Sequence, residues 1–379
     1  MPPGYAITVL FVAAAVASAL WPRPTHGPRQ TPTFVLGTLG SEVPFMLAWY
    51  LLLVTWLTVD SGDLTTPASW ITAAVAALVL LGLIRIVRQS AQAGQVLDSA
   101  LTSVLGEDRP RANRGRHRLR AGWALTAPFR LPDPRIRRER NTAYGPAPGR
   151  ANLLDVYRRR GAGAGPVLIY FHPGGFSGGS KNRQSKLMLE TLALHGWTCI
   201  SANYRLRTDY WTILADAKRV IAWTRTEGRR HGADPDVLVT AGGSAGANLA
   251  AACALSAGRA DLQPGFEEAD TSVSAVVGLY GYYGEVFGQP GTQVSDLTGS
   301  SVPPVLIVHG EKDPMASAAG AREFTARLRD RRQGPVAYAE LPGAVHNFDL
   351  FASLRHAAVT TAVLEFVTAI TREPGPSSR

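Results

Sequence analysis

The fold is decided by the stretch Asp236-Val237-Leu238-Val239-Thr240-Ala241-Gly242-Gly243-Ser244-Ala245-Gly246-Ala247-Asn248-Leu249-Ala250-Ala251-Ala252. Its short apolar first part predicts a buried strand, and its last part, rich in alanine and leucine, predicts a helix. A serine between small residues at such a turn projects its oxygen into solvent above the end of a sheet. The stretch therefore indicates an α/β fold with Ser244 as a candidate nucleophile.

A second loop of this kind lies upstream, where the apolar run 166–171 continues into His172-Pro173-Gly174-Gly175-Phe176. Acyl transfer needs backbone N–H donors about 3 Å from the developing oxyanion. Gly174 and Gly175 let the backbone approach a substrate, and Ala245 adds an N–H directly after the serine. Pro173 has no N–H and is excluded as a donor. We expect Gly174, Gly175 and Ala245 to form an oxyanion hole, with His172 organising the loop.

The pattern Gly-x-Ser-x-Gly is weak by itself, because it also matches at Ser177 in Gly175-Phe176-Ser177-Gly178-Gly179. Ser244 follows a strand and opens a helix of small residues. Ser177 lies in a glycine-rich loop that continues into Lys181 and Asn182, and no helix is predicted to begin there. Ser244 is therefore the preferred nucleophile, and Ser177 is interpreted as a loop residue.

The base and the carboxylate that orients it should follow the nucleophile in the chain. Asp313 comes after the apolar run 305–308, and His346 follows a further predicted strand at 336–340. We expect His346 to accept the Ser244 proton and Asp313 to hold its imidazole. Glu311 is the nearest rival acid. His309 is read as a structural histidine, and His356 is expected at the surface of the last helix.

The rest of the chain from 141 alternates strand and helix signals. Such a pattern predicts a mostly parallel sheet with helices on both faces. Helices are predicted near 213–228, after Ser244, and at 354–370. The predicted strands lie at 153–157, 167–171, 198–202, 237–240, 273–280, 305–308 and 336–340.

Residues 141–370 resemble the hormone-sensitive-lipase-like esterases of the α/β-hydrolase fold. The resemblance is carried by 152–157, the His172 loop, Asn203-Tyr204-Arg205-Leu206, Asp216, 232–235 and 243–246, together with Asp313 and His346. It implies a Ser244, Asp313 and His346 triad and the oxyanion hole named above. The chain departs from the family at Pro173, where the family has glycine, and at Arg207-Thr208, where it has Pro-Glu. Isoprenylcysteine-methylesterase-like enzymes share this layout.

These residues together predict a serine carboxylesterase or lipase that needs no metal or other cofactor. An acyltransferase that uses the same acyl-enzyme and a catalytically inactive binding module are the alternatives. Aromatic side chains near the predicted loops are candidates for the substrate pocket, although core packing would explain each of them as well. They are Phe176, Tyr210, Trp211, Tyr282 and Tyr283.

Residues 1–90 predict a membrane region with about three transmembrane helices, at 5–21, 43–59 and 68–84. Each run is near the short limit for crossing a hydrocarbon layer of about 30 Å. Basic residues follow the first and third runs, and acidic residues follow the second. This alternation places the N-terminus outside and the catalytic domain in the cytoplasm. The alternatives are buried helices of a cap domain and, for the first run, a signal peptide ending at Ala17-Ser18-Ala19.

Residues 91–140 are expected to form a juxtamembrane helix, at about 89–106 and near the membrane surface, and an arginine-rich linker. Residues 109–140 hold eleven arginines and two acidic residues, which accounts for most of the net charge of +10. Such a segment either attracts anionic lipid headgroups or is a solvated linker. Few aromatic residues are interleaved with the arginines, so nucleic-acid binding is not expected. Cys199 and Cys253 are expected to be buried thiols. The sequence leaves the oligomeric state open.

Overall fold

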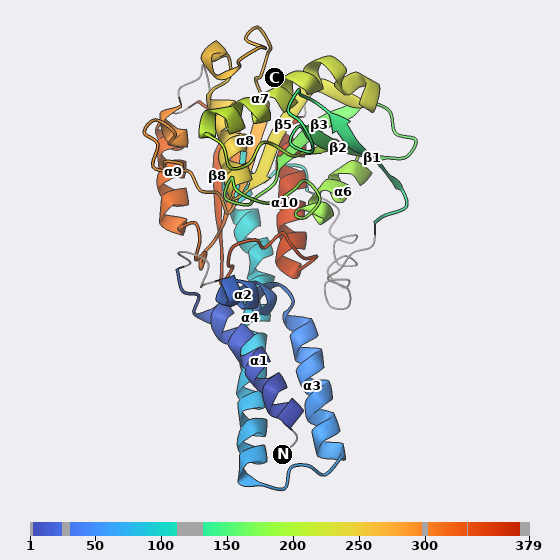
Figure 1. Ribbon diagram of the computed structural model, residues 1–379, viewed down its shortest axis with the longest axis vertical. Coiled ribbons are helices and arrows are strands. Elements are labelled where there is room, and N and C mark those ends of the chain that lie inside the picture. The colour runs from blue at the N-terminus through green and yellow to red at the C-terminus, as the bar shows by residue number, and fades with distance from the viewer. Residues whose placement is uncertain (1–2, 25–30, 112–131, 298–301, 332, 372–379) are drawn as a thin grey trace.

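The computed structural model describes residues 3–24, 31–111, 132–297, 302–331 and 333–371. A layered α/β domain occupies one end of the molecule, and a narrow bundle of helices extends from it (Figure 1). The N-terminus lies at the far end of that bundle, together with the turn between α3 and α4. The site residues predicted above all belong to the layered domain.

The sheet has eight strands in the order β1-β2-β4-β3-β5-β6-β7-β8. β1 and β2 pair antiparallel, as do β2 and β4, and the other neighbours are parallel. This confirms the mostly parallel sheet. The strands are β1 (Ile136–Ala143), β2 (Leu153–Arg159), β3 (Gly165–Phe171), β4 (Thr198–Ala202), β5 (Ala233–Gly243), β6 (Ala275–Leu279), β7 (Val305–Gly310) and β8 (Val336–Leu341).

Helices cover both faces of the sheet because successive strand residues point to opposite sides. In β3, Val167 and Ile169 belong to one apolar core, and Leu168 and Tyr170 belong to the other. The first core is covered by α7 (Tyr210–Glu227), α8 (Ala245–Leu255) and α9 (Ala318–Asp330), and the second by α6 (Lys186–Leu194), α10 (Leu354–Thr371) and the end of α4. Short 3-10 turns lie at Gly228–His231, Ala260–Leu262 and Val294–Asp296.

The helical bundle consists of α1 (Pro3–Leu20), α2 (Thr31–Glu42), α3 (Pro44–Asp60) and the first part of α4 (Pro67–Leu105). By length and composition α1 and α4 could each cross a membrane. α2 and α3 meet at a bend of 89° and qualify only as a pair, which would make a third span. α2, which was not predicted, lies across the bundle at its junction with the layered domain (Figure 1).

The third apolar run and the expected juxtamembrane helix are one continuous helix. α4 has 39 residues, and its second half packs against β8 and α10. Ala93, Leu97 and Leu101 are fully buried in the core of the layered domain. The prediction of a separate helix near the membrane surface is therefore wrong: apolar residues recurring every three or four positions face the protein interior here, not a bilayer.

The arginine-rich segment also departs from the prediction. Arg109 is buried and forms an ion pair of 2.5 Å with Asp98, so its guanidinium does not face lipid. The sheet begins at Ile136, before the expected boundary at 141. β1 is an edge strand, and its arginines are tolerated there because one side of the strand is exposed. Residues 112–131, which hold five of the eleven arginines in the predicted lipid-binding segment, lie outside the described residues.

His356 is buried, although a surface position was predicted for it. Its exposed fraction is 1%, and its Nδ1 lies 2.9 Å from the carbonyl oxygen of Phe351. α10 packs against the sheet on one side and against α4 on the other. The His356 side chain is therefore surrounded by protein, where the sequence predicted contact with solvent.

Candidate active site

Ser244 occupies the turn between β5 and α8. Its φ of 52° and ψ of −118° are a strained conformation for a residue with a side chain. The backbone N–H of Ser244 donates to the carbonyl oxygen of Leu279 at 2.9 Å, which fixes the turn to the end of β6. A strained backbone at this turn, held by the surrounding sheet, is expected where a serine side chain must project from the turn between a strand and a helix.

Only small residues fit around this turn. A Cβ at Gly246 would lie 2.0 Å from the Phe171 carbonyl oxygen, and one at Gly242 would lie 2.2 Å from the backbone of Gly246. Both contacts are far shorter than van der Waals distance, and backbone atoms cannot move aside cheaply. The glycines that flank Ser244 in the sequence therefore let α8 start close to β3 and β5.

Asp313 and His346 are brought together by loops after two neighbouring strands. Asp313 follows β7, and His346 follows β8. The His346 Nδ1 lies 2.6 Å from Asp313 Oδ2, and both side chains are buried. The other carboxylate oxygen, Oδ1, accepts the backbone N–H groups of Met315 at 2.8 Å and Ala316 at 2.9 Å. The carboxylate is thus held through both of its oxygens, with Oδ2 directed at His346.

This environment keeps Asp313 ionised. Burial alone would raise the pKa of its carboxyl group, but the attraction of His346, the hydrogen bond to it and the backbone donors outweigh burial and lower the pKa. His309 contributes in the same direction, because its Nε2 lies 3.5 Å from Asp313 Oδ2. His309 also lies 2.9 Å from the Ala316 carbonyl oxygen, which agrees with the structural role expected for it.

Two acidic side chains support the His346 loop without contacting its imidazole. Glu311, the rival acid, accepts the backbone N–H of Gly343 at 2.8 Å and so ties the two loops together. Asp349 is buried and accepts hydrogen bonds from the hydroxyl groups of Tyr170, Tyr280 and Ser185. The Tyr280 ring also packs edge-on against His346, with ring centroids 4.7 Å apart. These contacts fix the position of the His346 loop and of its imidazole ring.

The loop after β3 carries the predicted oxyanion donors. Gly174 has a φ of 135° and Gly175 has a φ of 58°, conformations that favour glycine. The Gly174 carbonyl oxygen accepts the N–H groups of Ser177 and Gly178, which closes the loop. Among the described residues no hydrogen-bond acceptor is found for the N–H of Gly174, Gly175 or Ala245. These three N–H groups are available to a ligand.

His172 organises this loop, as predicted. It is buried, its Nδ1 lies 2.8 Å from the Pro173 carbonyl oxygen, and its ring stacks on Tyr204 at 4.3 Å. Burial lowers the pKa of His172 to about 4, so the imidazole is neutral.

Arg207-Thr208 stands where the family has Pro-Glu. Here Arg207 adopts a φ of 57°, and its backbone N–H donates to the Phe176 carbonyl oxygen at 2.9 Å.

Ser244 and His346 line the same cavity, which has a volume of about 480 Å³. Gly174 and Gly175 also line it. A second cavity of about 280 Å³ meets the first at Ser244 and is lined by Phe176, Tyr282 and Phe287. A bound ester could thus place one part on each side of the serine.

The predicted substrate residues divide into two groups. Phe176 and Tyr282 line the smaller cavity. Tyr210 is fully buried and its hydroxyl donates to Asn248 Oδ1 at 2.8 Å, while Trp211 packs edge-on against it. Tyr283 is buried and stacks on Phe324 at 4.0 Å. The last three residues belong to the core packing that was the alternative interpretation.

Sequence reasoning missed the wall that α2 gives to the larger cavity. Phe34, Val35, Thr38 and Leu39 line it opposite the glycine loop. α2 is held against the layered domain by a buried ion pair of 2.5 Å between Glu42 and Arg355. The signal in the sequence was Glu42 itself, an acidic residue between two apolar runs that needs a buried partner.

Comparisons with known proteins place the chain among esterases. The BD-FAE family matches residues 154–286. LipM of Mycobacterium tuberculosis, described as a probable carboxylic ester hydrolase, is 34% identical over 418 aligned positions, which cover 99% of this chain and 96% of LipM. Esterase LipQ of the same organism is 37% identical and covers 74% of this chain and 75% of its own length.

The fold agrees with solved structures. Thermogutta terrifontis esterase 2, in a form phosphoramylated by tabun, superposes with a TM-score of 0.52 at 22% identity and covers 62% of this chain and 93% of its own. The strand order, the turn at Ser244 and the match to LipM over nearly the whole of both chains lead to one conclusion. This chain belongs to the hormone-sensitive-lipase-like esterase family of the α/β-hydrolase fold and hydrolyses carboxylic esters.

Proposed function

We propose that this esterase works through an acyl-enzyme on Ser244 and is anchored in a membrane by its N-terminal helices. The observation that carries the first part is the shared cavity of Ser244 and His346, with His346 hydrogen-bonded to Asp313 on its other side. The arrangement supplies a nucleophile, a base and a buried charge that orients the base.

In this mechanism the Nε2 of His346 takes the Ser244 proton as Oγ attacks the ester carbonyl carbon. The N–H groups of Ala245 and of Gly174 or Gly175 stabilise the oxyanion that forms. His346 then gives its proton to the leaving alcohol, and the acyl group stays on Ser244. Water loses a proton to His346 and attacks the acyl carbonyl carbon, and the bond to Ser244 Oγ breaks as His346 returns the proton to that oxygen, which releases the carboxylic acid. Asp313 stabilises the imidazolium in both halves.

The membrane part of the proposal is supported by the side chains of the bundle. Large apolar residues point outward from α1, α3 and α4, among them Leu10, Trp49 and Leu81, with exposed fractions of 66%, 66% and 62%. Charged residues are scarce until Arg85. Such a surface is stable in hydrocarbon and costly in water. We propose that α1, the bent pair α2–α3, and α4 anchor the enzyme, with the layered domain in the cytoplasm.

Covalent labelling tests the acyl-enzyme. Full-length protein in detergent is treated with a fluorophosphonate, from which a serine Oγ displaces fluoride, and the modified peptide is identified by mass spectrometry. We expect the label on Ser244 and on no other residue. The Ser177→Ala variant, which changes the other match to the pattern, should still be labelled. A label that persists in Ser244→Ala would overturn the assignment.

Thiol labelling tests the membrane topology. Cys199 and Cys253 are both buried, so an introduced cysteine is the reactive one. Ser61, after α3, and Glu268, on the layered domain, are both exposed. In intact cells a membrane-impermeant maleimide should label Ser61→Cys and spare Glu268→Cys until the cells are lysed. The reverse pattern would place the layered domain outside.

A further inference from the structure

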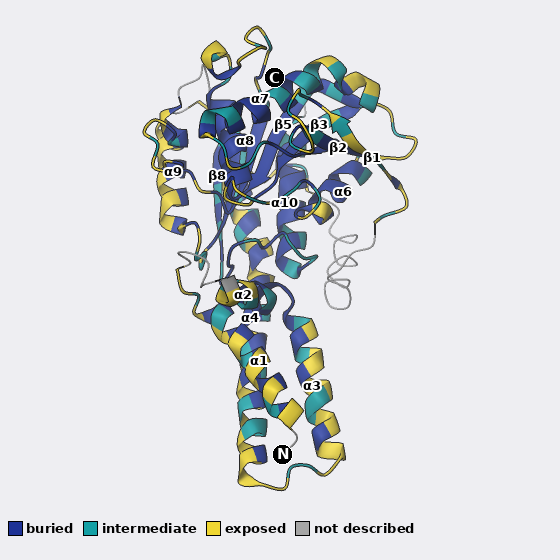
Figure 2. Ribbon diagram, viewed as in Figure 1, coloured by how far each residue is buried: buried dark blue, intermediate teal, exposed yellow. Residues whose placement is uncertain are grey.

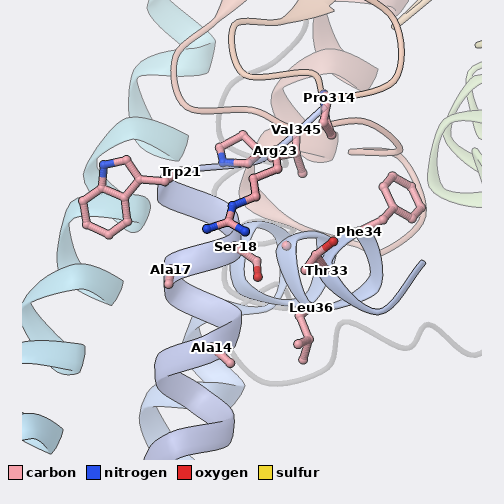
Figure 3. Close-up of a pocket in the computed structure, with 12 residues that line it drawn as sticks. Ala14, Ala17, Ser18, Trp21, Arg23, Thr33, Phe34, Leu36, Pro314 and Val345 are labelled. Carbon is pink, nitrogen blue, oxygen red and sulfur yellow. The ribbon is translucent and has the colours of Figure 1, made fainter. Parts of the chain in front are cut away.

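A cavity outside the catalytic machinery lies in the angle between α1 and α2. It has a volume of about 420 Å³, a size that accommodates a small-molecule ligand. Figure 3 shows Ala14, Ala17 and Ser18 on one face of α1, with Leu36 of α2 opposite and Pro314 and Val345 of the catalytic loops above. The cavity therefore joins the helical bundle to the loops that carry Asp313 and His346.

The shape of this cavity is set by close contact of two helices. A Cβ at Gly40 would lie 2.4 Å from the Ala15 carbonyl oxygen, so α1 and α2 touch there backbone to backbone. Away from that contact the small side chains of Ala14 and Ala17 leave space that a larger residue would fill. The space is a consequence of side-chain size on α1.

The lining is mostly apolar and shares one residue with the cavity of the candidate active site. Phe34 lines this cavity and also the cavity of Ser244 and His346. The Phe34 ring lies 6.3 Å from the His346 ring, measured between centroids. Among the described lining residues only Arg23 is charged, and Figure 3 shows its guanidinium directed toward Ser18. An apolar space of this kind favours a hydrocarbon over water.

We infer that this α1–α2 cavity receives the long alkyl chain of the acyl group, so that the substrate is a lipid ester that reaches Ser244 from the bilayer past Phe34. The inference rests on the proposed acyl-enzyme and membrane anchor. The ester carbon lies at Ser244, the acyl chain runs along α2, and the alcohol occupies the smaller cavity of Phe176 and Tyr282. Specificity for chain length is then set by the anchor helices.

Filling the cavity tests this assignment. Full-length Ala17→Trp is compared with Ile7→Trp, which adds the same side chain to an exposed position of α1. We expect Ala17→Trp to lower kcat/KM for p-nitrophenyl laurate by at least about tenfold while turnover of the butyrate changes less than about twofold. Ile7→Trp should leave both unchanged. Equal losses on both esters in Ala17→Trp would overturn the inference.

A second experiment uses the unaltered protein and does not depend on the folding of a variant. The probe is a fluorophosphonate whose phosphorus-bound dodecyl chain ends in a diazirine, applied in phospholipid nanodiscs. After Ser244 is modified, irradiation should cross-link the chain end to Ala14, Ala17 or Leu36. Cross-links to Tyr282 or Phe287 instead would overturn the inference and leave the acyl-enzyme intact. Absence of any Ser244 adduct would refute the proposed function itself.

Discussion

The helical bundle and the layered domain differ in where their large apolar side chains lie. The sheet of the layered domain is buried, whereas much of the outer surface of the bundle is exposed (Figure 2). Most of the large apolar residues of the layered domain are buried, and the exposed residues of the bundle include many large apolar ones. Some of the side chains in the interior of the bundle are small, among them the buried Ala15, Ala19 and Ala76. The difference is what a chain with one part in water and one part in the proposed membrane would show, and the candidate active site lies at the junction of the two parts.

The junction of the two regions is polar and specific. Glu42 and Arg355 form a buried pair, Ser353 donates to Glu42 at 2.6 Å, and Lys312 donates to the Leu20 carbonyl oxygen at 2.7 Å. Lys312 precedes Asp313, so the end of α1 is linked to the catalytic loop. The bundle thus supplies part of the active-site wall and also fixes its position.

The largest expected effect lies on the layered side of this comparison. Asp313→Asn removes the charge that orients His346, and kcat for p-nitrophenyl butyrate should fall about 10⁴-fold. Glu311→Gln is the matched control, because Glu311 bonds a backbone N–H and does not contact the imidazole. It should lose less than about tenfold. Equal losses of kcat in the two variants would show that Asp313 is not the carboxylate that orients His346.

At the junction, Glu42→Gln should destabilise the protein by about 3–5 kcal/mol, because it leaves the guanidinium of Arg355 buried without its counter-charge. Glu323→Gln breaks an exposed pair with Arg327 one helical turn away and should cost at most about 0.5 kcal/mol. Thermal unfolding in detergent compares the two variants. Similar shifts would mean that the junction is solvated and the two regions are independent.

Acid should weaken the layered domain through His172. Burial lowers its pKa in the fold to about 4 from an ordinary 6.5. Between these values the unfolded chain binds a proton that the folded chain does not, so stability falls as the pH drops through this window, by at most about 3 kcal/mol. His172→Phe keeps a ring against Tyr204 and should flatten this part of the pH profile of the unfolding temperature. An unchanged slope would refute the buried neutral imidazole.

The smallest expected effect separates two adjacent leucines of α3. Leu51 is fully buried in the bundle, and Leu52 has an exposed fraction of 46%. Leu51→Ala should cost about 2 kcal/mol through lost packing. Leu52→Ala should stay within about 0.5 kcal/mol, because in the proposed membrane anchor its side chain faces hydrocarbon or detergent in both the folded and the unfolded state. Similar losses in the two variants would show that this face of α3 packs against protein.

The same contrast explains what could be predicted from the sequence. Ser244, Asp313 and His346 each follow an apolar strand, and parallel strands bring their carboxyl ends to one edge, so local signals were sufficient to place them. The strands themselves were predicted from short apolar runs. His172 was assigned from its glycine neighbours, and its contacts agree with that assignment.

The errors occurred where local pattern and tertiary context disagree. Arg85 and Arg88 suggested that a span ended, but no proline interrupts α4 and the helix continues into the core. The arginines of β1 hid an edge strand, where charged side chains are tolerated on the exposed side. α2 was missed because it is short and rich in glycine and threonine, and its position depends on Arg355, more than 300 residues away.

The most direct test of the central claim is the turnover of p-nitrophenyl butyrate by full-length Ser244→Ala in detergent, with the unfolding temperature as a check of the fold. We predict that kcat falls by at least about 10⁴-fold while the unfolding temperature stays close to that of the parent protein. Turnover within about tenfold of the parent, from protein that unfolds normally, would contradict the account.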